Sequence, residues 1–289
     1  MDKYHFTAHI MAFIVSFVWG VTFVSSKIIL RYYSPTEILI IRFLLAYLML
    51  WIIYPRTHKF VLKQELWYFV AGITGVSLYF VFENSALLYS TASNVGVILS
   101  SVPMVVAIIS NIFLEDEKLH RNMIYGFTIT ILGVGLVIFN GQVNLHLNPI
   151  GDMLALLCCI VWGFYSLAIK KMDTSVSNIF RTRRVFLYGL LIVICYQLLF
   201  NGFSDLKPLL IPVVGFNLLF LGIVASGLCF VFYNHAIKVL GSITTSNYLY
   251  LMPLFTVITS TIVLKEKLTM LVSIGCILII CGTYISDKR

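Results

Sequence analysis

Apolar stretches long enough to cross a lipid bilayer recur along this chain. The first runs from about residue 8 to 29, and similar stretches follow after short polar connections. Stretches of 18 or more apolar residues are typical of transmembrane helices. Charged residues make up 11% of the 289 residues, against roughly 25% in a soluble domain. The sequence therefore predicts a polytopic membrane protein.

We expect ten spans, and we expect all of them to be helical. An isolated strand exposed to lipid would leave its backbone groups without hydrogen bonds. The connections are too short to hold a soluble domain. The first span is followed by many like it and lacks a small-residue cleavage site, so we do not interpret it as a signal peptide. The ten expected spans cover residues 8–29, 36–54, 66–88, 92–114, 122–139, 150–170, 178–200, 209–235, 243–264 and 269–286.

The basic residues in and beside the connections predict the orientation. Eleven Lys and Arg residues lie on the side of the N-terminus and four on the opposite side. Cytoplasmic connections carry the excess of positive charge, so we expect both termini in the cytoplasm of a cell membrane, such as a bacterial inner membrane. Orientation also accounts for the net charge of +8 without a nucleic-acid partner. The eleven are Lys3, Arg56, Lys59, Lys63, Lys118, Arg121, Lys170, Lys171, Lys238, Lys288 and Arg289, and the four are Arg31, Lys207, Lys265 and Lys267.

The two halves of the chain resemble each other. The segment FVWGVTFVSSK at 17–27 aligns with IVWGFYSLAIK at 160–170, and FLEDEKL at 113–119 aligns with VLKEKL at 263–268. Each half holds five spans, an odd number, so the second copy must be inverted relative to the first. Inverted repeats are a transporter architecture, with the site near the membrane midplane between the halves. We therefore expect two five-helix repeats, 8–139 and 150–286.

These features together are similar to the EamA family of the drug/metabolite transporter superfamily. The resemblance rests on the Trp-Gly pair that opens each half, an asparagine near the end of the third span, a proline in the fourth, and the Glu-Lys-Leu turn before a glycine-rich fifth. It covers almost the whole chain. It implies a ten-helix secondary transporter that moves small metabolites, often amino acids or related solutes, outward.

Glu83 stands in the apolar stretch FVFENSALLYSTASNVGVILSSVP at 80–103. A charge at the bilayer centre costs about 2.5–3.5 kcal/mol on insertion scales. Such a residue needs a watery cavity, a cation or a proton. Tyr79 lies one turn earlier on the same face, within reach of a hydrogen bond, and Asn84 follows directly. We expect Glu83 to face an internal cavity and to exchange a proton during transport; the alternative is a structural acid near the interface.

The repeat selects further candidates for the substrate pathway. Trp19 and Trp162 fall in the middle of their spans, where each either packs in the core or lines a pocket with its ring and its N–H donor. The repeat pairs Asn84 with Asn234 and Glu83 with Tyr233. The neighbouring His235 is a candidate for substrate or proton contact, or a solvated residue near the cytoplasmic end of its helix.

Small and polar residues also follow the fourth and ninth spans. They allow close helix contact in lipid, or they line the pathway beside Pro103 and Pro253, each of which frees a backbone carbonyl. Structural pairing is favoured for Arg42 and Arg184, although the five-residue spacing from Glu37 to Arg42 is poor for a direct helical pair. Lys27 and Lys170 are interpreted as anchors that reach the interface, with a gating or substrate role as the alternative. The pathway candidates in these two spans are Asn94, Ser100, Asn247 and Tyr248.

Three classes of function are weighed. The leading one is a secondary transporter of a small polar metabolite; export is favoured over import by the resemblance alone. An intramembrane enzyme would need a nucleophile with its base, an Asp dyad or a metal site, and none is evident in the sequence. A channel or scaffold remains the third class. The six cysteines show no metal-ligand spacing, so no cofactor is expected. The sequence does not set the oligomeric state.

Overall fold

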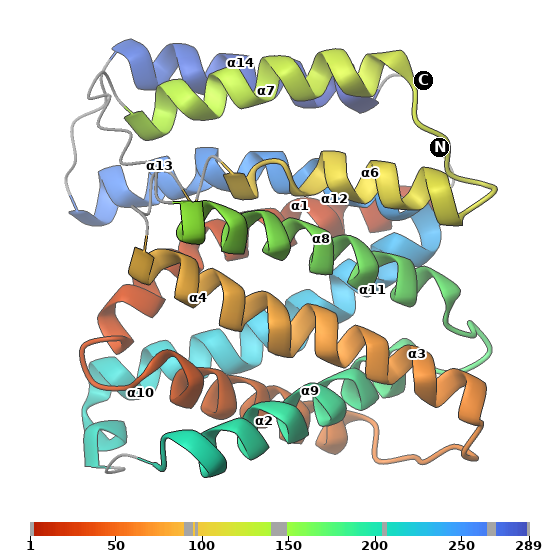
Figure 1. Ribbon diagram of the computed structural model, residues 1–289, viewed down its shortest axis with the longest axis vertical. Coiled ribbons are helices and arrows are strands. Elements are labelled where there is room, and N and C mark those ends of the chain that lie inside the picture. The colour runs from red at the N-terminus through yellow and green to blue at the C-terminus, as the bar shows by residue number, and fades with distance from the viewer. Residues whose placement is uncertain are drawn as a thin grey trace.

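The computed structural model describes residues 3–89, 95, 98–139, 149–203, 207–264 and 270–287. Within these residues the chain is helical and contains no strand, which confirms the predicted fold class (Figure 1). The first half contains α1 Lys3–Ile29, α2 Pro35–Ile53, α3 Leu62–Gly72, η1 Ile73–Leu78, α4 Tyr79–Tyr89, α6 Val102–Phe113 and α7 Arg121–Phe139. The second half contains α8 Pro149–Lys171, α9 Asn178–Phe200, η2 Lys207–Leu210, α10 Pro212–Leu219, η3 Phe220–Leu228, α11 Cys229–Leu240, α12 Ser242–Asn247, η4 Tyr248–Leu251, α13 Met252–Leu264 and α14 Met270–Asp287.

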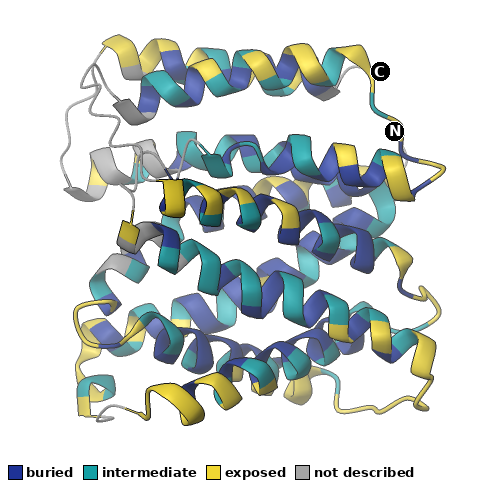
Figure 2. Cartoon of the chain, viewed as in Figure 1, coloured by how far each residue is buried: buried dark blue, intermediate teal, exposed yellow. Residues whose placement is uncertain are grey.

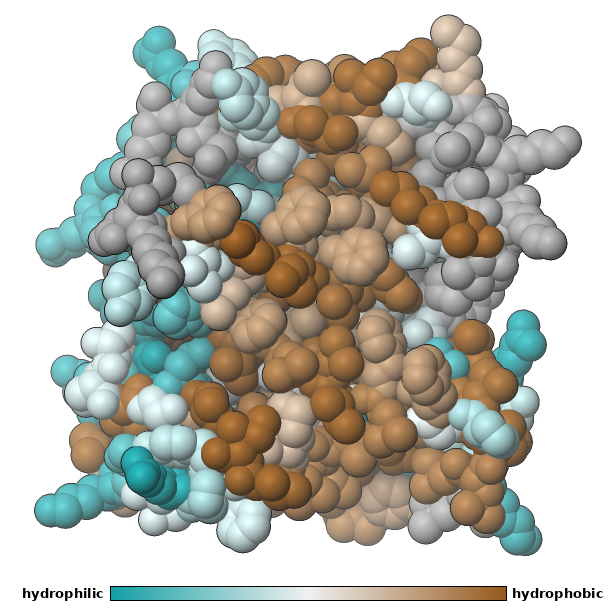
Figure 3. All heavy atoms as spheres, turned by 180° about the vertical axis from the view of Figure 1, so that it is seen from behind, coloured by the Kyte–Doolittle hydropathy of each residue, from teal (hydrophilic) through white to brown (hydrophobic). Residues whose placement is uncertain are grey.

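The helices lie side by side, and their length and surface fit a bilayer. Among the described residues, six helices are long and apolar enough to cross a membrane, and three shorter apolar helices accompany them. Figure 3 shows apolar residues over the middle of the face in view and polar residues at its two ends. Buried residues gather where the helices meet, and exposed ones face outward (Figure 2).

Both termini lie at one end of the molecule, which we call the terminal end (Figure 1). The connections 54–61, 114–120 and 172–177 lie there too, whereas the connection 30–34 lies at the opposite end, the far end. α1 starts at the terminal end and α8 finishes there, so equivalent helices of the two halves run in opposite directions.

The halves exchange packing partners. α1 packs against α11 and α13 of the second half, and α8 packs against α4 and α6 of the first. In the same way, α2 packs against η3 and α9 packs against η1. For these four helices, each contact in one half thus has its equivalent in the other, as a two-fold relation between the halves requires.

The third and eighth spans each contain a π-helical stretch, η1 and η3, at equivalent places. The sequence predicted helices there but did not indicate the π-helical hydrogen-bond pattern. Glycines at these stretches let neighbouring helices approach closely: a Cβ on Gly75 would clash with the ring of Tyr165, and one on Gly72 would lie 2.7 Å from the Val185 carbonyl. π-helical turns occur often at functional sites.

α2 begins with a complete capping box. The Ser34 hydroxyl accepts from the Glu37 N–H, the Glu37 carboxylate accepts from the Ser34 N–H at 2.9 Å, and Pro35 occupies the first turn. These side chains satisfy two backbone donors that a helix start leaves open. Glu37 is therefore engaged at its own helix start, in keeping with the poor helical spacing between it and Arg42.

Candidate functional site

Two tryptophans from the two halves meet at the centre of the protein. The ring centroids of Trp19 on α1 and Trp162 on α8 lie 5.5 Å apart with planes at 82°, an edge-to-face contact. The Trp19 Nε1 donates to the Ala225 carbonyl in η3 at 2.8 Å, and the Trp162 Nε1 donates to the Tyr233 hydroxyl at 3.2 Å. Both rings are buried. The two predicted residues therefore sit together at the junction of the halves.

Further aromatic rings surround the tryptophan pair. The Tyr79 ring lies 4.9 Å from Trp162, as does the Tyr165 ring, and Phe230 lies 5.4 Å from Trp19. Together with Tyr233 these rings form what we call the aromatic centre: Trp19, Tyr79, Trp162, Tyr165, Phe230 and Tyr233. Sequence reasoning identified three of the six. Of the other three, Tyr233 appears in the sequence analysis only as the repeat equivalent of Glu83, and Tyr165 and Phe230 are recognised only through their contacts.

Glu83 lies at the edge of the aromatic centre. It is partly exposed, and its Oε1 accepts from the Tyr79 hydroxyl at 3.4 Å, a long hydrogen bond. Arg42 on α2 is within electrostatic reach of this carboxylate. Among the described residues, however, the two side chains do not form an ion pair. An acid and a base on two neighbouring helices at membrane depth thus lie within electrostatic reach of each other without a direct ion pair.

Arg42 has partners from both halves. Its Nε donates to the Ser226 hydroxyl in η3 of the second half, and its guanidinium lies 5.0 Å from the centre of the Phe80 ring. Structural pairing was expected for both Arg42 and Arg184. Arg42 pairs with a hydroxyl and an aromatic ring, and the Arg184 Nη2 lies 2.8 Å from the Glu65 Oε2.

A hollow of about 370 Å3 opens at the far end, between the start of α2, α4 and the end of α9. Val81 and Ser85 in its wall come from α4, the helix that carries Glu83, and Leu39 comes from α2, the helix that carries Arg42. The hollow is lined mainly by uncharged polar and apolar groups. The lining residues are Ser34, Pro35, Thr36, Glu37, Leu39, Val81, Ser85, Tyr196, Gln197, Asn201 and Gly202.

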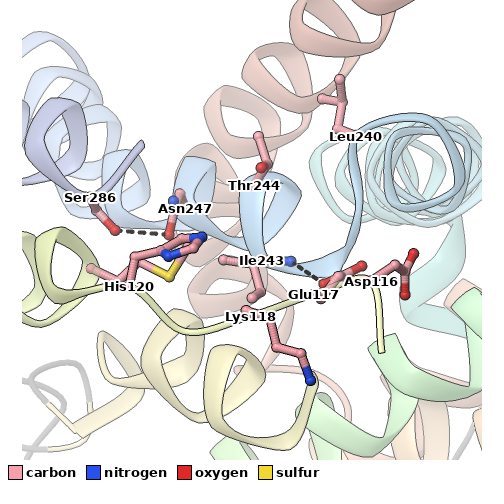
Figure 4. A pocket seen from close by; sticks show the side chains of 10 residues that line it. Asp116, Glu117, Lys118, His120, Leu240, Ile243, Thr244, Asn247 and Ser286 are labelled. Atoms are coloured by element: carbon pink, nitrogen blue, oxygen red, sulfur yellow. Dashed lines mark hydrogen bonds between the residues drawn. The ribbon is translucent and has the colours of Figure 1, made fainter. Parts of the chain in front are cut away.

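A smaller hollow of about 170 Å3 lies at the terminal end (Figure 4). The predicted pathway residue Asn247 lines it, and its side-chain oxygen accepts from the Ser286 hydroxyl at 3.3 Å. Its Nδ2 is buried without a hydrogen-bond partner. Asp116, Glu117 and His120 line the opposite wall. Asn247 is therefore separated from Glu83, which lies toward the other end.

The remaining candidates are dispersed. Asn234 is buried in a network: it accepts from the Tyr165 hydroxyl and donates to the Thr182 hydroxyl at 3.0 Å. The Tyr248 hydroxyl shares a hydrogen bond of 2.8 Å with the His9 Nδ1. His235 on α11 is partly exposed, and Ser100 is buried. Asn94 and the side chain of Asn84 lie outside the described residues.

The comparisons with known proteins match the whole chain. The model of the EamA-like transporter family matches residues 6–139 and again 149–286. An uncharacterized transporter of Archaeoglobus fulgidus is 28% identical over 287 residues, covering 97% of both chains. The uncharacterized transporter YvbV of Bacillus subtilis is 27% identical, covering 98% of this chain and 92% of its own. A crystal structure with 17% identity superposes with a TM-score of 0.79 over 97% of this chain and 96% of its own, which shows the shared fold. With both halves matched by one family model, the chain belongs to the EamA-like transporter family of polytopic membrane proteins.

Proposed function

We propose that the protein is a secondary active exporter of a small polar metabolite, such as an amino acid, that works by alternating access. The observation that carries the proposal is the pair of Arg42 and Glu83, two opposite charges at membrane depth that do not neutralise each other directly. A charge there costs several kcal/mol unless something compensates it. A zwitterionic solute compensates both, because its carboxylate complements Arg42 and its ammonium complements Glu83.

The surroundings of this pair fit a transport path. The far-end hollow is lined by residues of α2 and α4, the helices that carry Arg42 and Glu83, and the aromatic centre lies beside Glu83. Aromatic rings present broad apolar faces to the uncharged part of a solute. Helices of each half pack against equivalent helices of the other half. The two halves can therefore rock about the axis that relates them, as inverted repeats do in other transporters.

Glu83 is the group that couples transport to protons in this proposal. Its carboxylate binds the ammonium group when ionised and releases it when a proton takes that place. Glu83 is partly exposed, and Ser85 on the same helix lines the far-end hollow. One proton enters for each solute released, so a proton gradient drives the solute outward.

The test is transport by Glu83→Gln in proteoliposomes. Gln keeps the shape and much of the hydrogen bonding but cannot ionise, so we expect normal folding and loss of the pH dependence of transport. Counterflow of radiolabelled amino acids, with sugars, amines and carboxylic acids as competitors, identifies the solute class. A channel gives no counterflow, and an importer accumulates solute in the direction opposite to the one we expect.

Asp173→Asn is the matched control for this test. Asp173 is an exposed acid in the connection between α8 and α9, remote from the site. Hydrogen bonds from the Ser175 hydroxyl and N–H keep its pKa below the usual range, so it stays ionised at neutral pH. The Asn variant should keep the wild-type pH profile. If Glu83→Gln also keeps that profile, Glu83 is structural and the proton-coupled proposal is wrong.

The orientation is part of the proposal. The end that holds both termini also holds the excess of Lys and Arg, so we place it in the cytoplasm. The far-end hollow then faces outward. Reporter fusions at residue 289 should give a cytoplasmic signal, and fusions in the connection 140–148 an external one; the reverse pattern would invert the proposed direction of transport.

A further inference from the structure

One buried carboxylate joins the two halves at the terminal end. Glu117 lies in the connection between α6 and α7, and its Oε1 accepts from the Ser242 N–H at 2.7 Å. Its Oε2 accepts from the Ile243 N–H at 3.0 Å, the bond drawn in Figure 4. Ser242 and Ile243 begin α12 in the second half. Both carboxylate oxygens of Glu117, which belongs to the first half, thus accept hydrogen bonds from backbone N–H groups of the second half.

The backbone of the second half leaves space for the Glu117 carboxylate. Gly241 directly precedes α12 and has φ +92°, a conformation that glycine adopts without strain. A Cβ at this position would lie 2.9 Å from the Glu117 Oε1. The carboxylate therefore occupies space that a larger residue at 241 would fill, and the junction between α11 and α12 is matched to it.

A lysine neutralises the carboxylate. The Lys170 Nζ at the end of α8 lies 3.3 Å from the Glu117 Oε1 and 3.1 Å from the Asp116 Oδ2. Slight burial acts to raise the pKa of Asp116, but the hydrogen bond and charge of Lys170 outweigh it and lower that pKa. Lys170 was expected to anchor at the lipid interface, and instead it closes a three-residue ionic cluster. Hydrogen bonds to charged groups are stronger than those between neutral groups, and Glu117 accepts two of them.

The partners of Glu117 in the second half are themselves tied together. The Lys238 Nζ on α11 donates to the Lys170 carbonyl at 2.6 Å and also to the Met172 carbonyl. The end of α8 and the end of α11 therefore form one unit within the second half. Glu117 fastens the first half to this unit, and the remaining wall of the terminal-end hollow is completed by Ser286 near the end of α14.

We propose that Glu117 is the latch of the gate at the terminal end, which holds that end shut while the far end is open and releases α12 when the halves rock the other way. The inference rests on the alternating access proposed above. Two observations indicate a conformation with the far end open and the terminal end shut. The larger hollow lies at the far end, and Glu117 is hydrogen-bonded to α12 at the terminal end. Release of α12 breaks the two charge-assisted hydrogen bonds between Glu117 and the α12 backbone. Water or an incoming solute then takes the place of the lost partners.

The test measures access to each end with introduced cysteines and a membrane-impermeant maleimide. Thr244→Cys reports the terminal-end hollow, and Ser85→Cys reports the far-end hollow; labelling is compared with protein that carries neither, so that the six native cysteines are accounted for. Glu117→Gln weakens the latch, and we expect labelling at 244 to rise about tenfold and labelling at 85 to fall. Glu115→Gln removes the same charge from an exposed neighbour and should change neither.

Two outcomes overturn the latch. Labelling at 244 no faster in Glu117→Gln than in Glu115→Gln means that the carboxylate does not hold the gate. Faster labelling at 244 with no change at 85 means that the joint loosens locally without moving the halves. If Glu117→Gln does not fold, Lys170→Gln keeps both backbone hydrogen bonds and should raise labelling at 244 by a smaller factor; no rise there also counts against the latch.

The experiment separates the latch from the proposed function. Labelling needs no substrate, so opposite changes at 244 and 85 support the latch whatever the solute is. If those changes occur while no amino acid shows counterflow, the proposed solute is wrong and the latch stands. If counterflow occurs and the labelling is unchanged, the transporter is correct and Glu117 is a structural residue.

Discussion

The indole N–H of Trp19 in the first half donates to the backbone carbonyl of Ala225 in the second half, 206 residues away in sequence. The acceptor lies inside the π-helical stretch η3, and Trp19 also contacts its symmetry equivalent, Trp162. The hydrogen bond joins α1 to the eighth span where the two halves meet. In the proposed rocking motion, this contact lies close to the axis.

Replacing Trp19 by Phe should destabilise the protein more than replacing Trp162 by Phe. The first change leaves a buried carbonyl without its 2.8 Å donor, and the second removes a bond of 3.2 Å to the Tyr233 hydroxyl. An unsatisfied buried group costs about 1–3 kcal/mol, and we expect the Trp162 variant to lose about 1 kcal/mol or less. Thermal unfolding in detergent gives the comparison. Equal losses would show that ring packing, and not the hydrogen bonds, dominates at both positions.

The pairing of α7 with α14 depends on glycines that face each other. A Cβ on Gly133 would lie 2.7 Å from the Gly275 carbonyl, and one on Gly126 would lie 2.5 Å from the Gly282 carbonyl. Gly133→Ala should therefore force the helices apart and cost about 1–3 kcal/mol. Leu132→Ala alters an exposed neighbour on the same helix and is the control. A Gly133→Ala protein as stable as the control in thermal unfolding would contradict the close packing.

The sequence predicts the helices well and their partners poorly. The start of α2 follows from the order Ser34, Pro35 and Glu37, because a capping box uses local chemistry. The π-helical stretches could not be predicted, because a run of apolar residues is compatible with both the α-helical and the π-helical hydrogen-bond pattern. Structural pairing was expected for Arg42, but its partner Ser226, 184 residues away, could not be identified from the sequence. Such contacts depend on how the halves dock, and no local pattern records that.

The candidate site was predicted in part for the same reason. The repeat identified Trp19 and Trp162 as equivalent, and the cost of a charge in lipid identified Glu83. Glu117 appeared in the repeat segment FLEDEKL only as a marker of the alignment. Its structural role is visible only beside the α12 backbone that it binds.

The ion pair between Glu65 and Arg184 should be modestly stabilising. The Glu65 Oε2 also accepts from the Tyr188 hydroxyl at 2.6 Å, and Arg184 is one-quarter exposed. Partly exposed pairs contribute about 1 kcal/mol or less. A double-mutant cycle with Glu65→Gln and Arg184→Gln should give a coupling energy of about that size. A coupling energy near zero would show that Tyr188 alone satisfies the carboxylate.

Arg42→Lys should impair transport while leaving the fold intact. Lysine keeps the positive charge but lacks the planar guanidinium that donates to Ser226 and lies over the Phe80 ring. We expect the KM for a zwitterionic solute to rise about tenfold, the equivalent of about 1.4 kcal/mol in binding. Ser226→Ala, which removes only the hydrogen bond, should have a smaller effect on KM.

The comparison that assigns a role to Arg42 is between solutes. If the guanidinium binds the carboxylate of the cargo, Arg42→Lys should weaken the zwitterion more than the corresponding amine, which has no carboxylate to lose. Arg184→Lys, at an ion pair away from the aromatic centre, should leave both KM values unchanged. An equal rise for zwitterion and amine in Arg42→Lys would mean that Arg42 holds α2 against η3 and does not contact the cargo.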